Sequence, residues 1–194
     1  MTKIIGLTGG IGSGKTTIAK YIETKGIPVY IADERAKIIT NSPEILSLIK
    51  EKFGQDVFDN DVLNRKKLAN IVFNHPKQLK QLNQIIHPAV KLDFDIWLQN
   101  HSKFEYVVKE SAILFKSNNF IKFYITIAVV TPLPLRIERI LLRDNTDKAE
   151  IMKRIDNQLS DNELIEKCDY VIYNSELDIS LMQVDAILKK LKIK

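Results

Sequence analysis

The sequence predicts an α/β protein in which helices flank a parallel β-sheet and a helical segment is inserted between strands. The apolar, β-branched stretch Lys3–Gly9 is typical of a strand, and it ends in a glycine-rich loop. Apolar residues then recur at helical spacing until Gly26, and Ile27–Ile31 is typical of a second strand. A strand, a helix and a strand within about 30 residues form a βαβ unit, which implies parallel strands joined by a right-handed crossover.

The sequence after the second expected strand changes character. Four stretches have a helical period, and loop signals such as "GQDVFDND" separate them: "PEILSLIKEKFG", "NRKKLANIVFNH", "PKQLKQLNQII" and "HPAVKLDFDIWLQNH". We therefore predict a helical lobe over residues 33–103. His87 and Pro88 are expected to begin its last helix, because proline favours the first helical position.

The α/β alternation resumes after this lobe. Strands are expected over residues 105–111, 123–130 and 168–174. Helices are expected over residues 134–144 and 180–193. The charged stretch between Asp144 and Lys167 contains few apolar residues, which is typical of a mobile cover because segments with little burial open most easily.

These patterns divide the chain into three parts. The predicted core comprises residues 1–32, 104–136 and 168–194. The lobe over residues 33–103 is inserted into this core, and a small helical lid is expected over residues 137–167. A chain of 194 residues, 45% hydrophobic and 27% charged, has the size and composition of one folded domain with such insertions.

Charge alone does not identify a partner. The net charge is +5, but the lysines are scattered and no aromatic-interleaved basic stripe or nucleic-acid motif is present. A site for small polyanions explains the excess equally well, so we expect no nucleic-acid partner.

The chain is expected to be cytoplasmic and without a membrane partner. Its longest apolar run, Phe123–Val130, has the length of a buried strand and falls far short of the roughly 20 residues that span a bilayer. The N-terminus lacks a signal-peptide pattern, and the single cysteine, Cys168, fits a reducing compartment. The oligomeric state is not predictable from these features.

The glycine-rich loop predicts a phosphate site. Gly9, Gly14, Lys15 and Thr16 match the P-loop pattern G-x-x-x-x-G-K-[ST], between a strand and a helix as the motif requires. Glycines let backbone N–H groups turn toward phosphate oxygens, and the following helix adds its positive end. Lys15 is expected to reach the β- and γ-phosphates of ATP, and the Thr16 hydroxyl to bind Mg²⁺. The expected ATP-binding residues of the loop are Gly10, Ile11, Gly12, Ser13, Gly14, Lys15, Thr16 and Thr17. The alternative is a glycine-rich turn with an incidental Gly-Lys-Thr.

Two further features are consistent with phosphoryl transfer, and each has a structural alternative. Asp33 follows the second strand, where a carboxylate is placed to accept a hydroxyl proton, but aspartate is also a good helix N-cap. Arg136, Arg139 and Arg143 share one helical face, opposite an apolar face, and arginines stabilise a transferring phosphoryl group. A solvated charged face gives the same pattern.

Several stretches together resemble one family. "IGLTGGIGSGKTT", "LNRKKLANIVF", "LNQIIHPAV", "RIERILLRD", "RIDNQLS" and "CDYVIYN" occur in the order and spacing of dephospho-CoA kinases, from about Ile4 to Asn174. The P-loop is common to many NTPases, whereas "LN-x-I-x-HP-x-V" inside a helical insertion is far more specific. The resemblance implies a nucleoside-monophosphate-kinase-like fold and transfer of the ATP γ-phosphoryl to the ribose 3′-hydroxyl of dephospho-CoA, the last step of coenzyme A synthesis.

The resemblance also implies roles for individual residues. Asp33 matches the proposed catalytic base, which would act together with Lys15. Arg139 would face the transfer site, Arg143 would act from the lid on the ATP phosphates, and Asn174 resembles a position near the adenine. The substrate-side positions are expected to be Thr8, Asp33, Arg65, His87 and Arg139.

Three positions depart from the family pattern. Ile31 stands where the family often has the first aspartate of Asp-x-Asp. Glu110 replaces an aspartate at the end of the third strand, which keeps a carboxylate that can orient Mg²⁺ through water. Lys116 stands where glutamate is usual, and we assign it no role.

Two other functions stay open at this point. One is a different P-loop kinase that acts on a nucleoside monophosphate or another small molecule. The other is a non-enzymatic nucleotide- or nucleic-acid-binding module, which the basic charge would suit.

Overall fold

The computed structural model describes residues 1–115, 121–144 and 146–192, so Lys116 lies outside the described residues. The chain forms two compact units. Unit 1 comprises Met1–Ile31 and His101–Lys194, and unit 2 comprises Ala32–Asn100. Within the described ranges, no helix is long and apolar enough to cross a membrane.

A five-stranded parallel sheet forms the centre of unit 1. Its strands are β1 (Lys3–Gly9), β2 (Val29–Ile31), β5 (Tyr106–Glu110), β6 (Ile125–Val130) and β7 (Tyr170–Tyr173). They are arranged in the order β2-β5-β1-β6-β7, with every pair parallel. The predicted parallel sheet is confirmed. Because β5 and β6 flank β1 on opposite sides, the carboxyl end of β1 is the topological switch point at which such sheets bind ligands.

The helices of unit 1 cover both faces of the sheet. They are α1 (Lys15–Thr24), α6 (Leu133–Arg143), α7 (Lys148–Asp156), α8 (Asp161–Lys167) and α9 (Leu177–Lys190). Alternate residues of β6 point to opposite faces. Ile127 and Val129 belong to the core cluster that contains apolar residues of α1 and α9. Ala128 and Val130 pack with Leu164 of α8 on the other face.

The charged segment between Asp144 and Lys167 is only partly a loosely packed cover. Leu164 of α8 is 3% exposed against the sheet, and α7 also buries Ile151 completely. One apolar residue per turn is enough to dock a short helix, although it leaves the mean composition charged. The extent of the lid stays a prediction.

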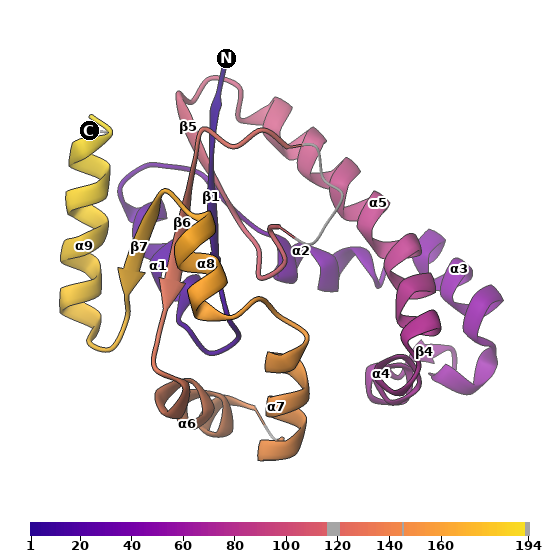
Figure 1. Cartoon of the computed structure of the whole chain (residues 1–194). Coiled ribbons are helices and arrows are strands. Elements are labelled where there is room, and N and C mark those ends of the chain that lie inside the picture. Colours follow the sequence, from indigo (N-terminus) through magenta and orange to yellow (C-terminus); the bar gives the residue numbers. More distant parts are fainter. Residues whose placement is uncertain (116–120, 145, 193–194) are drawn as a thin grey trace. The chain divides into compact units, whose positions relative to one another are not determined.

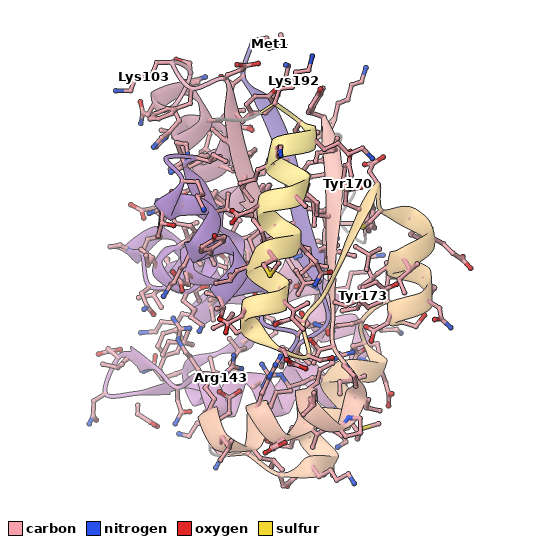
Figure 2. All side chains as sticks on the ribbon, turned by 90° about the vertical axis from the view of Figure 1, so that its left-hand side faces the viewer. Met1, Lys103, Arg143, Tyr170, Tyr173 and Lys192 are labelled. Atoms are coloured by element: carbon pink, nitrogen blue, oxygen red, sulfur yellow. The ribbon has the colours of Figure 1, made fainter. Side chains whose placement is uncertain are left out.

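The phosphate loop and α6 lie at one end of unit 1, and residues near the two chain termini lie at the other end (Figure 1, Figure 2). Figure 1 shows α6 and α7 beyond the carboxyl end of β6, at the end of the sheet where the loop after β1 lies. Figure 2 labels Met1 and Lys192 at the opposite end of the unit from Arg143, with Tyr170 and Tyr173 on β7 between them. The phosphate loop and the arginine helix therefore share one end of the sheet.

Unit 2 is a small helical body with its own core. Its elements are α2 (Ala32–Ile39), α3 (Pro43–Phe53), the 3₁₀ turn η1 (Gln55–Val57), β3 (Phe58–Asp59), β4 (Val62–Leu63), α4 (Arg65–Asn74) and α5 (Pro76–Asn100). The helices α3, α4 and α5 surround buried apolar residues such as Ile49 and Leu68. The stretch expected to be a loop also contains the β3–β4 hairpin, because Asn60 and Asp61 adopt the positive φ angles that a tight hairpin turn requires.

The prediction of two helices around His87 was wrong. Residues 76–100 form the single helix α5, with Pro88 in its interior. Buried Leu82 and Phe94 on either side of Pro88 anchor both halves. Pro88 is exposed, and so is Gln84, the residue whose carbonyl would otherwise accept a hydrogen bond from position 88. Packing of the whole helix therefore overrides the local preference of proline for a helix start.

Candidate active site

The phosphate loop runs from the end of β1 into α1. Gly14 is the N-cap of α1 and has a φ of 86°, which favours glycine. A Cβ at this position would also lie 2.1 Å from Nδ2 of Asn174. No side chain caps α1, although the N–H of Thr17 bonds back to the Gly14 carbonyl at 3.0 Å. The positive N-terminal end of the helix favours an anion at the loop.

Lys15 is held inside the loop. The residue is 7% exposed, and its Nζ donates to the carbonyl of Gly10 over 3.1 Å. Nζ also lies 3.9 Å from Oε1 of Glu110, which ends β5 and is 1% exposed. The backbone carbonyl and the carboxylate fix the ammonium group at the switch point, where it can neutralise phosphate charge.

Two buried hydroxyl groups next to the loop are not satisfied by protein atoms. Thr8 Oγ1 and Ser13 Oγ have no hydrogen-bond partner within the described part of the chain, and both residues are about 99% or more buried. Buried polar atoms are almost always paired in folded proteins, so such exceptions indicate a place for a ligand or water.

The carbonyl of Ser13 is held by side chains that directly follow β6 and β7. Asn174, directly after β7, donates its Nδ2 to this oxygen over 2.7 Å. The Asn174 Oδ1 in turn accepts from Ser180 Oγ at 2.9 Å. Thr131 Oγ1 also lies 3.0 Å from the Ser13 carbonyl oxygen. The Asn174 amide thus supports the loop, and its expected contact with ATP stays a prediction.

The three arginines of α6 have different environments. Arg139 lies at the loop, since its NH1 is 3.7 Å from the position of a Cβ on Gly14. Arg143 is exposed, and its Nε and NH2 donate to the carboxylate of Asp144 over 2.8 and 2.9 Å. These bonds lower the pKa of Asp144.

Arg136 contradicts the expected division of α6 into an arginine face and an apolar face. It is 4% exposed, whereas Leu141 is 46% exposed. Its Nε donates to the carbonyl of Ile11 over 2.9 Å, and its NH1 forms an ion pair with Asp161 at 3.1 Å. Gln158 Oε1 accepts the N–H of Ile11 at 2.7 Å. Periodicity and residue spacing did not indicate the contacts of Gln158 and Asp161.

The loop offers a hard oxygen environment for a divalent cation. Thr16 lies in the first turn of α1, next to Lys15, and the Glu110 carboxylate lies close to the same lysine. Nowhere in the described ranges do three or more His, Cys, Asp or Glu side chains gather to hold a metal. The Thr16 hydroxyl and the Glu110 carboxylate are hard oxygen donors of the kind that fit Mg²⁺, which commonly takes few protein ligands and keeps waters and phosphate oxygens.

The candidate acceptor residues lie in unit 2. Asp33 is the second residue of α2 and exposed, so the N-cap alternative was wrong. Arg65 begins α4, and its NH2 donates to the carbonyl of Lys37 over 2.8 Å. His87 lies half-buried in α5, and burial lowers its pKa. The sequence did not indicate that Arg35 of α2 pairs with Asp93 of α5, with its Nε 2.8 Å from Oδ2.

A five-stranded parallel sheet with a lysine-bearing glycine loop at its switch point defines a P-loop nucleotide-binding fold. A shikimate kinase from Acinetobacter baumannii has this fold, with a TM-score of 0.55 at 18% identity, over all of this chain and 96% of its own. Residues 3–178 match the family model described as dephospho-CoA kinase. The chain belongs to the dephospho-CoA kinase family.

Individual relatives agree with this assignment. The dephospho-CoA kinase of Fusobacterium nucleatum is 40% identical over 174 residues, which is 89% of each chain. That of Bacteroides fragilis strain YCH46 is 39% identical over 171 residues, covering 88% of this chain and 83% of the relative. The solved dephospho-CoA kinase from Campylobacter jejuni is 25% identical with a TM-score of 0.69, over 99% of this chain and 98% of its own. The chain is a phosphotransferase that carries out the final step of coenzyme A biosynthesis.

Proposed function

We propose that this enzyme transfers the ATP γ-phosphoryl to the ribose 3′-hydroxyl of dephospho-CoA through the residues identified above. The single observation that carries the donor half is the placement of Lys15. Its buried ammonium group lies between the Gly10 carbonyl and Glu110 at the switch point of the sheet. A cation held in this way meets the β- and γ-phosphates without reorganising, and preorganised charge is most effective away from water.

The loop and α1 bind the remaining phosphate charge. The uncapped first turn of α1 presents N–H groups, and the buried hydroxyls of Thr8 and Ser13 provide further polar atoms at the cradle. The Thr16 hydroxyl would hold Mg²⁺ directly, and Glu110 would orient it through water. When bound, Mg²⁺ neutralises charge that develops on the β- and γ-phosphate oxygens.

Two arginines stabilise the transferring group. Arg139 already lies beside Gly14, so its guanidinium is placed to follow the γ-phosphoryl as it moves. Arg143 acts from the lid. Because it is paired with Asp144, it reaches the phosphates only by exchanging that carboxylate for phosphate oxygens.

Unit 2 supplies the acceptor side. Asp33 follows β2 by two residues, and its exposed carboxylate accepts the proton of the 3′-hydroxyl as that oxygen attacks phosphorus. Arg65 and His87 hold the acceptor molecule. We also propose that the enzyme is cytoplasmic, as the free thiol of Cys168 suggests.

The base assignment is tested by comparing Asp33→Asn with Glu34→Gln, which changes the neighbouring exposed acid of α2 in the same way. ADP release is measured with Mg²⁺, ATP and either dephospho-CoA, AMP or shikimate. Asp33→Asn should lose about 10²- to 10⁴-fold in turnover of dephospho-CoA, the range for a general base, while ATP still binds. Glu34→Gln should keep the parent rate. A parent rate for Asp33→Asn removes it from the mechanism, and a preference for AMP contradicts the acceptor.

A further inference from the structure

Both backbone polar groups of one loop residue, Ile11, are bonded to side chains that are remote in sequence. The N–H of Ile11 donates to Oε1 of Gln158 over 2.7 Å. The carbonyl of the same residue accepts from Nε of Arg136 over 2.9 Å. Gln158 lies between α7 and α8, and Arg136 lies in α6. The orientation of the two peptide units that flank the Ile11 Cα is therefore set by residues outside the loop.

The guanidinium of Arg136 links the loop to α8. The residue is 4% exposed, and its NH1 pairs with Oδ1 of Asp161, the first residue of α8, at 3.1 Å. Its NH2 is buried without a hydrogen-bond partner within the described ranges. A Cβ on Gly10 would lie 2.1 Å from that NH2. The arginine thus packs directly against the loop backbone.

Such an arrangement is unfavourable for stability alone. A buried guanidinium loses its hydration, and the one ion pair with Asp161 and one backbone bond leave part of its hydrogen-bonding capacity unused. An apolar side chain of similar volume would fill this space at lower cost. What the arginine provides instead is a directed bond to the Ile11 carbonyl, complementary to the Gln158 bond on the other side.

We propose that Arg136 and Gln158 are positioning residues for the ATP phosphates, and that Asp161 orients Arg136. By fixing both backbone polar groups of Ile11, they set the course of the loop backbone that follows, up to Lys15, before the nucleotide arrives. A loop that is already ordered does not lose conformational entropy on binding, and its dipoles need no reorganisation. Because the N–H of Ile11 donates to Gln158, Ile11 supports the shape of the loop and does not itself contact the phosphates.

The proposal rests on the assignment of this loop to the phosphates. It is tested with Gln158→Met, which keeps the side-chain length but removes the acceptor. The matched control is Asn157→Leu, which removes the neighbouring amide; that amide donates to the Lys153 carbonyl over 2.8 Å, inside its own helix. Dissociation constants for ATP, ADP and AMP are measured by calorimetry, together with melting temperatures and hydrogen exchange of the Ile11 amide.

For Gln158→Met, we expect ATP and ADP to bind about five- to tenfold more weakly, which corresponds to one lost hydrogen bond. AMP, which lacks the β- and γ-phosphates, should lose less affinity than ATP and ADP, and the Ile11 amide should exchange faster. Asn157→Leu should leave all three affinities unchanged. Asp161→Asn should also weaken the binding of ATP and ADP. This variant tests the role of Arg136 while the buried arginine itself stays in place.

Two results would overturn the proposal. One is a lower melting temperature for Gln158→Met with unchanged affinity for ATP and ADP, which indicates a purely structural role. The other is an equal loss for ATP, ADP and AMP, which indicates a nucleoside contact. Lys15→Ala tests the assignment of the loop to the phosphates independently of the roles of Arg136 and Gln158. If Lys15→Ala binds ATP as tightly as the parent, the loop does not hold the phosphates.

Discussion

Asn174 and Ser13 are joined by a 2.7 Å hydrogen bond between the side-chain amide of one and the main-chain carbonyl of the other, although 161 positions separate them. Both residues are buried, and Ser180 fixes the amide by donating to its oxygen. The end of β7 thus holds the phosphate loop in the shape that Gly14 makes possible.

This bond predicts how Asn174→Ala affects nucleotide choice. If the amide serves the loop, turnover with ATP and with GTP should fall by a similar factor, about fivefold or more for the loss of a buried hydrogen bond. If it reads the adenine, the ratio of kcat/KM for ATP over GTP should fall instead. Steady-state assays with both triphosphates distinguish the roles, and Ser180→Ala, one contact further away, should give a smaller loss of the same kind.

The buried pair of Lys15 and Glu110 predicts that substitutions can change the stability of the protein and its turnover independently. Lys15→Met leaves the buried carboxylate of Glu110 without this cation, which should lower the free energy of unfolding by about 3 kcal/mol. Turnover should fall by about two to three orders of magnitude, as for loss of one preorganised charge.

The double variant Lys15→Met with Glu110→Gln is the matched test. Removing both charges should restore most of the stability in urea unfolding, but none of the turnover, because the cation that meets the phosphates is still missing. A double variant as unstable as Lys15→Met alone would show that the two side chains are not energetically coupled.

Most of the fold was predictable because its signals are local. The βαβ unit and the later strands are marked by apolar periodicity within windows of ten or so residues. Each strand of the five-stranded sheet was found within one or two residues of its observed bounds, whereas the β3–β4 hairpin was missed. The error at Pro88 has a physical cause, since burial of residues on both sides of the proline decides whether the helix continues. No local window contains that information.

Residue spacing alone, without the family resemblance, predicted the candidate site only where it is contiguous in sequence. The loop from Gly9 to Thr16 carries its own pattern, because wrapping a backbone around phosphate demands glycines at fixed spacing. Gln158 and Asn174 meet that loop from 147 and 161 positions away. A single amide side chain has no periodic signal, so only the folded sheet brings these residues to the loop.

The position of Pro88 predicts a stabilising substitution. Inside α5 it lacks the N–H that would bond to the preceding turn, so Pro88→Ala should raise the free energy of unfolding by about 1 to 3 kcal/mol. Pro76→Ala is the matched control, because Pro76 is the first residue of the same helix, where proline is tolerated. Chemical denaturation of both variants measures the difference, and equal effects at the two positions would contradict the interpretation.

The lowered pKa of His87 predicts a pH dependence of stability. Burial disfavours the charged imidazole, so the folded pKa lies below the ordinary value of 6.5. As the pH falls below about 6.5, the unfolded chain takes up a proton at this residue that the folded chain does not. The contribution of His87 to the free energy of unfolding therefore decreases toward acid, and it is fully regained above the ordinary pKa. The slope has an upper limit of about 1.4 kcal/mol per pH unit for one proton.

His87→Gln tests this dependence because glutamine stays neutral at every pH. Urea unfolding of the parent and the variant between about pH 5 and pH 8 should show a shallower loss of stability toward acid in the variant. A proton NMR titration of the imidazole in the folded parent measures the pKa directly. A value at or above 6.5, or identical slopes for the two proteins, would show that the half-buried site in α5 does not disfavour the charged ring.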